Sequence, residues 1–269
     1  MALINFKLKP PEEIPPFGLE SNTSLHWFGL TDGDCWLTLR DKTLYEYSDA
    51  KMQQWSRRPT RYSDDYIVQL LEDLTELFPI LAESVPVPLY DIAKTYSSLN
   101  GLKEKIRAWV DTWPEEESAD TEANDQQDDL LTEWIHARTL YSRHLKGGPH
   151  LSFFRHEDKI TLVWKADQVD DNQIPYWTAG NGQLEMDYTD FIDQVEDFGN
   201  RFFPAMAAQV AIAVDRDWGT IALDKIRLVQ EQQERKADFD RQVALLKGNP
   251  GANTDWNPII GAVQNLMRS

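Results

Sequence analysis

The sequence predicts an α+β fold: an antiparallel sheet built from two similar ββ(β)α halves, backed by helices and followed by a helical C-terminal tail. Short β-rich segments separated by turn residues occur twice, at residues 25–47 and 151–188. Each series leads into a segment whose apolar residues recur at helical spacing. We expect the two halves to share a core in one compact domain.

The first half, residues 1–113, begins with a predicted meander of short strands. Strands are expected at residues 25–28, 35–39 and 44–47. A turn at residues 31–34 separates the first two, and Gly33 is expected to supply its positive φ.

Helices are expected to follow this meander. Ser63, which precedes two aspartates, marks the start of the first one, and Pro79 should kink or end it. Another helix is expected between residues 89 and 113. The apolar stripe of the first helix comprises Ile67, Leu70, Leu71, Leu74, Leu77 and Phe78.

Residues 114–129 differ in composition from the rest of the chain. They contain neither a basic residue nor a large apolar residue, which predicts a solvated, flexible acidic linker between the halves. The carboxylates of this segment are Glu115, Glu116, Glu117, Asp120, Glu122, Asp125, Asp128 and Asp129.

The second half, residues 130–214, repeats the order of strands and helix. A helix that begins at Leu130 and ends near residues 146–149 precedes a hairpin at residues 151–164, and a third strand spans 182–188. A long helix is expected from about residue 189 to 214. Residues 215–269 should form the helical C-terminal segment, interrupted at 248–251.

The two halves share a short sequence likeness. Residues 65–70 align without gaps with 190–195, and 77–79 then fall on 202–204. Duplication of one unit would explain this likeness. So would chance convergence, because amphipathic helices share apolar positions by necessity, and the sequence leaves both explanations open.

The charge of the chain sets the class of partner that it can bind. It has 45 acidic and 27 basic side chains, a formal net charge of -18. Nucleic acid and anionic membranes, which are bound through clustered Lys and Arg, are therefore not expected as direct ligands. A basic protein would be attracted, although solubility alone also accounts for an acidic surface.

The cysteine content and the N-terminal residues predict a cytoplasmic location. Cys35 is the single cysteine, so an internal disulfide and a multi-thiolate metal site are excluded, as suits a reducing compartment. No export signal is visible before Pro10. The longest mostly apolar run, residues 205–214, is about half the length needed to cross a bilayer.

We find no motif that assigns a catalytic residue, a cofactor or a metal. Residues 180–182 carry Gly-Asn-Gly without the third glycine of a phosphate-binding loop, and 215–219 lack the later ligands of a calcium loop. Trp113 and Trp134 stand beside acidic residues. We therefore predict that these two tryptophans and the eight carboxylates at 115–129 bind a partner, although core packing is the more frequent role of a single tryptophan.

The block His26-Trp27-Phe28-Gly29-Leu30-Thr31-Asp32-Gly33 resembles a bacterial family of uncharacterised proteins. The preceding residues 14–18, Trp164, the Trp177-Thr178-Ala179 stretch and the helix at 191–206 fit the same pattern. This resemblance implies an association with polymorphic toxin systems, in which a cytoplasmic immunity protein neutralises a toxin. It implies no catalytic residues.

The leading hypothesis is therefore a non-enzymatic, immunity-type protein that neutralises a cognate toxin or another basic protein by direct binding. One alternative is an enzyme of unrecognised type, in which Asp32, Asp34 and histidines of the second hairpin meet in a cleft. Another is an acidic inhibitor that mimics DNA. The oligomeric state stays open.

Overall fold

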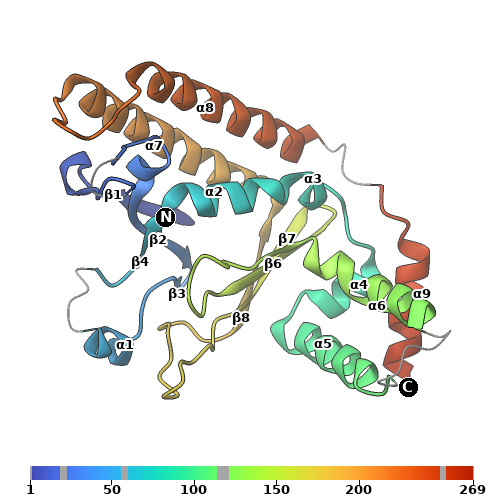
Figure 1. Ribbon diagram of the computed structural model, residues 1–269. Helices are drawn as coiled ribbons and strands as arrows, with labels where there is room; N and C mark the ends of the chain where they lie inside the picture. Colours follow the sequence, from blue (N-terminus) through green and yellow to red (C-terminus); the bar gives the residue numbers. More distant parts are fainter. Residues whose placement is uncertain (1, 19–22, 56–59, 114–120, 249–252, 269) are drawn as a thin grey trace.

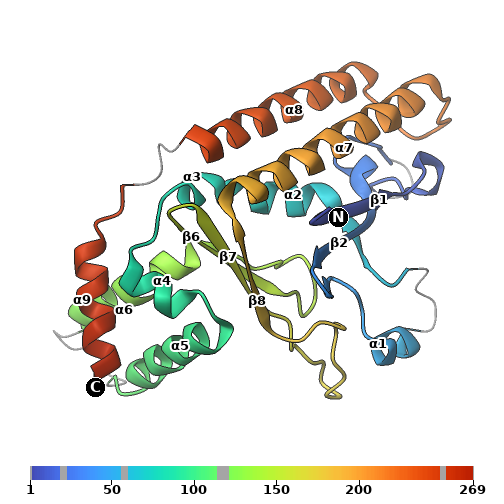
Figure 2. The same ribbon diagram turned by 180° about the vertical axis from the view of Figure 1, so that it is seen from behind.

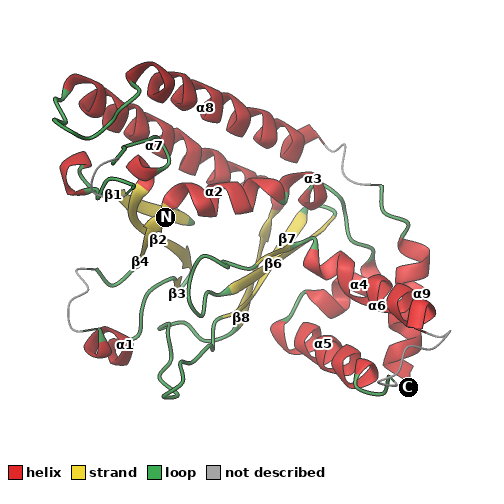
Figure 3. Ribbon diagram, viewed as in Figure 1, coloured by secondary structure: helices red, strands yellow, loops and turns green. Residues whose placement is uncertain are grey.

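The computed structural model describes residues 2–18, 23–55, 60–113, 121–248 and 253–268 (Figure 1). It confirms the α+β fold class and the antiparallel pairing of the strands. Within these residues the strands form two four-stranded sheets, which helices flank (Figure 3).

The first sheet is centred on β2 (Asp32–Leu39). Strand β1 (Ile4–Leu8) pairs along one edge of β2, with Phe6 opposite Cys35. Strands β4 (Ser63–Tyr66) and β3 (Lys42–Leu44) pair with successive parts of the other edge. The strand predicted at residues 25–28 is wrong: the N-terminal β1 supplies that pairing, and a short 3-10 helix, η2 (Gly29–Thr31), follows residues 25–28. A second 3-10 helix, η1 (Pro11–Glu13), follows β1.

Gly33 does not have the predicted role either. It lies inside β2 opposite Leu8, and its φ is not among the positive ones. A Cβ atom at this position would lie 2.3 Å from the backbone oxygen of Lys7. Glycine is needed here because the backbone of β1 approaches closely.

The helices of the first half differ from the prediction at their boundaries. The predicted helix start at Ser63 is wrong, because residues 63–66 form β4 and the helix begins at Ile67. They are α1 (Asp49–Gln54), α2 (Ile67–Glu76), α3 (Phe78–Leu81), α4 (Val87–Ala93) and α5 (Tyr96–Val110). Ile67, Leu70 and Leu74 are buried, and Pro79 falls in the first turn of α3, directly after α2 ends. The single helix predicted at 89–113 is two helices, α4 and α5, and Thr95 caps the second.

The second half matches the prediction except at its first helix. The helix expected to end near residues 146–149 ends at His136, because residues 139–140 form a strand. Its strands are β5 (Thr139–Leu140), β6 (His150–His156), β7 (Lys159–Lys165) and β8 (Gly182–Asp187). Its helices and those of the C-terminal segment are α6 (Thr121–His136), α7 (Tyr188–Asp215), α8 (Lys225–Gly248) and α9 (Trp256–Arg268). The predicted hairpin, third strand and long helix correspond to β6 and β7, β8 and α7.

The acidic linker predicted at 114–129 is wrong for residues 121–129, because α6 begins at Thr121. Buried Leu131, Trp134 and Ile135 hold the second half of this helix against the protein. Once this half is packed, each further helical residue adds a hydrogen bond without a new nucleation cost, which explains the acidic first half. Residues 114–120 lie outside the described residues.

The two halves have the same order of paired strands. Strands β1, β2 and β4 pair in that order and lead into α2, and β6, β7 and β8 pair in that order and lead into α7. The gapless alignment of 65–70 with 190–195 is shifted by one helical turn, because Asp65 lies in β4 whereas Asp190 lies in α7. The topology therefore supports two similar halves, with a different residue correspondence.

Two apolar cores hold the elements together. The main core lies between the two sheets, α2, α7 and α8, and α8 runs alongside α7 (Figures 1 and 2). In the second core, α4, α5, α6 and α9 pack on the opposite face of the second sheet, where they contact Phe154 and Val163. Because alternate residues such as Phe153 and Leu162 face the main core, this sheet is buried on both faces.

Candidate functional site

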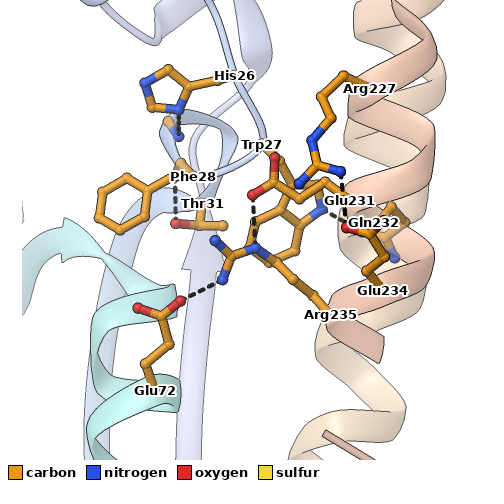
Figure 4. A network of polar contacts seen from close by, with 11 residues as sticks. His26, Trp27, Phe28, Thr31, Glu72, Arg227, Glu231, Gln232, Glu234 and Arg235 are labelled. Carbon is orange, nitrogen blue, oxygen red and sulfur yellow. Dashed lines mark hydrogen bonds and ion pairs between the residues drawn. The ribbon is translucent and has the colours of Figure 1, made fainter. Parts of the chain in front are cut away.

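The block at residues 26–33 holds helix α8 in place (Figure 4). Trp27 is fully buried, and its Nε1 donates a hydrogen bond of 2.7 Å to Oε1 of Gln232. The guanidinium of Arg235 lies 4.5 Å from the centroid of the Trp27 ring and forms ion pairs with Glu231 and Glu72. This network links the loop before β2 to α2 and α8, which is a structural role.

The predicted site of Asp32, Asp34 and histidines is not assembled by any contact of the described residues. Asp32 accepts a hydrogen bond of 2.7 Å from Nζ of Lys9. His144 lies 3.7 Å from a carboxylate oxygen of Asp73, and His156 Nδ1 lies 2.9 Å from the carbonyl oxygen of Val85. His150 faces a separate cleft.

Helix α6 carries an acidic face, which includes three of the predicted partner-binding carboxylates. Glu122, Asp125, Asp129 and Glu133 are exposed and recur at intervals of three or four residues, so they lie on one face of α6. Among the residues that the structure describes, none of them forms an ion pair with Lys or Arg. We call these four residues the α6 acidic stripe.

The other predicted partner-binding residues occupy different positions. Burial raises the pKa of half-buried Asp128, and the charges of Asp129 and Asp125 raise it further. Trp134 was predicted as a surface anchor, but it is 3% exposed and belongs to the second core. Trp113 is half-buried against Trp109, with ring centroids 5.0 Å apart. The remaining carboxylates, Glu115, Glu116, Glu117 and Asp120, lie outside the described residues.

A cleft of about 310 Å³ lies between α5 and the second sheet. Tyr96, Asn100, Lys103 and Arg107 line it from α5, where their spacing of four, three and four residues places them on one face. The opposite wall includes Tyr141, His150 and Lys165. We call it the α5 cleft.

The α5 cleft is cationic. Burial lowers the pKa of Lys103, and the charge of Lys165 lowers it further. Burial also lowers the pKa of His150, as do the charges of Lys103, Lys165 and Arg143. The carboxylate of Glu104 also lines the cleft and accepts a hydrogen bond of 2.7 Å from Asn100.

Residues 3–261 match the family of unknown function DUF5984. The chain belongs to this family. Neither a curated protein nor a solved structure matches the chain. This match confirms that the chain belongs to a family of uncharacterised proteins, and it assigns no activity to the chain.

Two further features bear on the chemistry of this DUF5984 protein. In the described parts of the chain, no group of three or more His, Cys, Asp or Glu side chains could hold a metal ion. None of the helices described is both long and apolar enough to cross a membrane.

The sequence analysis missed the residues of the α5 cleft because it treated charge as a sum over the chain. A signal was present: Lys103 and Arg107 stand four residues apart, and Tyr96 and Asn100 extend the same helical face. The contribution of Tyr141, His150 and Lys165 could not be predicted, because it depends on how α5 packs on the second sheet.

Proposed function

We propose that this chain is a non-enzymatic binding protein that neutralises a basic macromolecular partner by direct contact, as an immunity protein neutralises a toxin. The α6 acidic stripe is the observation that carries this proposal. Its carboxylates are exposed and have no Lys or Arg partner among the described residues. The net charge of -18 adds a long-range attraction toward a cationic surface.

The position of the stripe on a helix supports a binding role. Like charges three or four residues apart on a helix cost about 0.2–0.5 kcal/mol per pair. Asp125 and Asp129 form one such pair, and Asp129 and Glu133 form another. A bound basic surface would offset the repulsion between these carboxylates. The free energy that the repulsion costs in the free protein would then favour binding.

The association with polymorphic toxin systems and a cytoplasmic location belong to the same proposal. The resemblance of the block at 26–33 to the uncharacterised bacterial family supports the association with toxin systems. The buried, unpaired Cys35 is consistent with a reducing compartment. That block has a structural role in the fold, so we propose that the α6 acidic stripe, and not this block, contacts the partner. The same stripe would suit a basic nucleic-acid-binding protein, in which case the chain would act as a DNA mimic.

Co-expression with the product of the neighbouring gene tests the proposal. We expect that product to be toxic, and we expect this chain to restore growth and to bind it in a purified mixture. The variant E122Q/D125N/D129N/E133Q should bind about tenfold or more weakly, because exposed ion pairs contribute about 0.2–1 kcal/mol each.

The control variant E13Q/D171N/D193N/D215N removes the same number of exposed charges from elsewhere on the surface. It should retain most of the affinity. Equal loss in both variants would attribute binding to overall charge and would contradict a site on α6. A toxic neighbouring product that this chain neither binds nor neutralises would overturn the immunity function, whereas capture of a nucleic-acid-binding protein would support the DNA-mimic form.

A further inference from the structure

We infer that the α5 cleft binds a small anionic ligand through a phosphate group. This inference goes beyond the proposed function, because it concerns a different surface with charge of the opposite sign. It rests on the lining of the cleft, on the missing partners of its cations and on their arrangement around one space.

Lys103, the half-buried cation of the cleft, differs from two buried cations elsewhere in the molecule. Lys51 and Arg138 each lie 2.7 Å from a carboxylate oxygen, of Asp170 and Glu83 respectively. Lys103, by contrast, is half-buried and has no carboxylate of the described residues within ion-pair distance. Arg107 and Lys165, which are the exposed cations of the cleft lining, also have no carboxylate of the described residues within ion-pair distance.

An unpaired, partly desolvated cation destabilises a protein unless a counter-ion joins it. The chain has an excess of carboxylates that could have supplied one. Here the cations instead face a cleft of about 310 Å³, which is near the lower end of the size of small-molecule sites. The arrangement leaves room for an anion that comes from solution.

The directions of the donors favour phosphate over a planar carboxylate. Lys103 and Arg107 reach the cleft from α5, whereas His150 and Lys165 reach it from β6 and β7. A phosphate carries a charge of about -1.5 to -2 at pH 7 and accepts hydrogen bonds on oxygens that point to several sides. It can therefore engage donors from both walls at once.

The rest of the surface narrows the choice of ligand. With a net charge of -18, the molecule repels polyanions that extend beyond the cleft. The half-buried rings of Tyr96 and Tyr141 line the walls and offer apolar surface to the remainder of a small ligand. These features select a phosphorylated small molecule rather than a nucleic acid.

Titration with inorganic phosphate, followed by calorimetry and by NMR of the histidine side chains, tests the inference. We expect saturable binding that sodium acetate at equal ionic strength does not reproduce. The resonances of His150 should shift, and the pKa of His150 should rise on saturation, because a nearby anion favours the imidazolium form.

Substitution separates a specific site from general attraction. Lys103→Met should weaken phosphate binding by about tenfold or more, because the lost hydrogen bond involves a charged group. Lys103→Arg should retain most of the binding. Lys105→Met, on the same helix but outside the cleft lining, is the matched control and should bind as the natural chain does.

Lys165→Met, at the exposed end of β7, provides a second variant should Lys103→Met fail to fold. Equal weakening by Lys105→Met, equal binding of acetate or an unmoved His150 pKa would each overturn the inference. The variant E122Q/D125N/D129N leaves Glu133, whose partner His136 lines the cleft, unchanged. It should still bind phosphate, so failure of the proposed partner binding and failure of this site are distinguishable.

Discussion

At Gly33 the backbones of β1 and β2 approach each other too closely to leave room for a side chain. A Cβ atom there would lie 2.3 Å from the Lys7 oxygen and 2.9 Å from the Cα of Leu8. Both are backbone atoms of β1, so a side-chain movement cannot relieve the overlap. The strands would have to separate, with loss of the hydrogen bonds between them.

We predict that Gly33→Ala lowers the free energy of unfolding by about 1–3 kcal/mol, the usual cost of overpacking. Urea unfolding followed by circular dichroism measures this change. Gly101→Ala in α5 is the matched control, because a Cβ at Gly101 meets no atom within 4 Å. It should stabilise the protein by about 0.5–1 kcal/mol, since alanine favours a helix interior. An unchanged stability of Gly33→Ala would contradict the close approach.

Helix α9 is joined to the rest of the protein by a buried polar network. Arg138, two residues after the end of α6, is 1% exposed, and its guanidinium donates to the carbonyl oxygen of Trp134 and to Glu83. Glu83 also accepts hydrogen bonds of 2.8 Å from the backbone nitrogen and the hydroxyl of Thr254. The ring of Trp256, the first residue of α9, lies 4.9 Å from the guanidinium carbon of Arg138.

Arg138→Met should therefore destabilise the protein by about 3–5 kcal/mol, because it leaves the carboxylate of Glu83 buried without its cation. Hydrogen exchange should show the largest loss of protection in α9. Arg216→Met is the control: its partner Glu12 is 3.6 Å away and both side chains are about half exposed, so the cost should stay below about 1 kcal/mol. Similar losses in the two variants would show that the network does not hold α9.

The elements that the sequence predicts well are those whose own residues decide them. The alternating and continuous apolar residues predict the positions of β6, β7 and β8, and the helical spacing predicts that of α7. The spacing also predicts α2, but its expected start, Ser63, lies in β4. The pairing of β1 with β2 joins residues about thirty positions apart and left no local signal. The composition of the first turns of α6 predicts a linker, because these acidic turns are ordered by the packed turns that follow them.

The residues of the candidate sites were predictable to different degrees. Glu122, Asp125 and Asp129 were recognised by composition alone, since exposed charge needs no tertiary contact. The prediction of a surface position for Trp134 is wrong. A tryptophan beside acidic residues can face either solvent or the core, and here Trp134 packs in the second core together with Leu131 and Ile135. His150 and Lys165 reach Lys103 only through the packing of α5 on the second sheet.

Acidic and basic side chains are concentrated on different surfaces of the molecule. Carboxylates exceed cations, and the α6 acidic stripe has no Lys or Arg partner among the described residues, while the α5 cleft is lined by cations without a carboxylate partner. Both surfaces adjoin the second core, because α5 and α6 each pack into it. Sites for a basic partner and for a small anion would therefore lie on neighbouring helices that share one packing layer.

The excess of carboxylates also makes the stability of the fold depend on salt. At low ionic strength the net charge of -18 repels itself in the compact state, and added salt screens this repulsion. We predict that the thermal midpoint rises as sodium chloride increases from about 20 to 300 mM, over which the Debye length falls from roughly 20 Å to 6 Å. The variant E122Q/D125N/D129N/E133Q should show a smaller rise, because it carries four fewer like charges. Lys103→Met should show the full rise, which separates screening from chloride binding in the α5 cleft; a midpoint that falls with salt would mean that attractive ion pairs outweigh the repulsion.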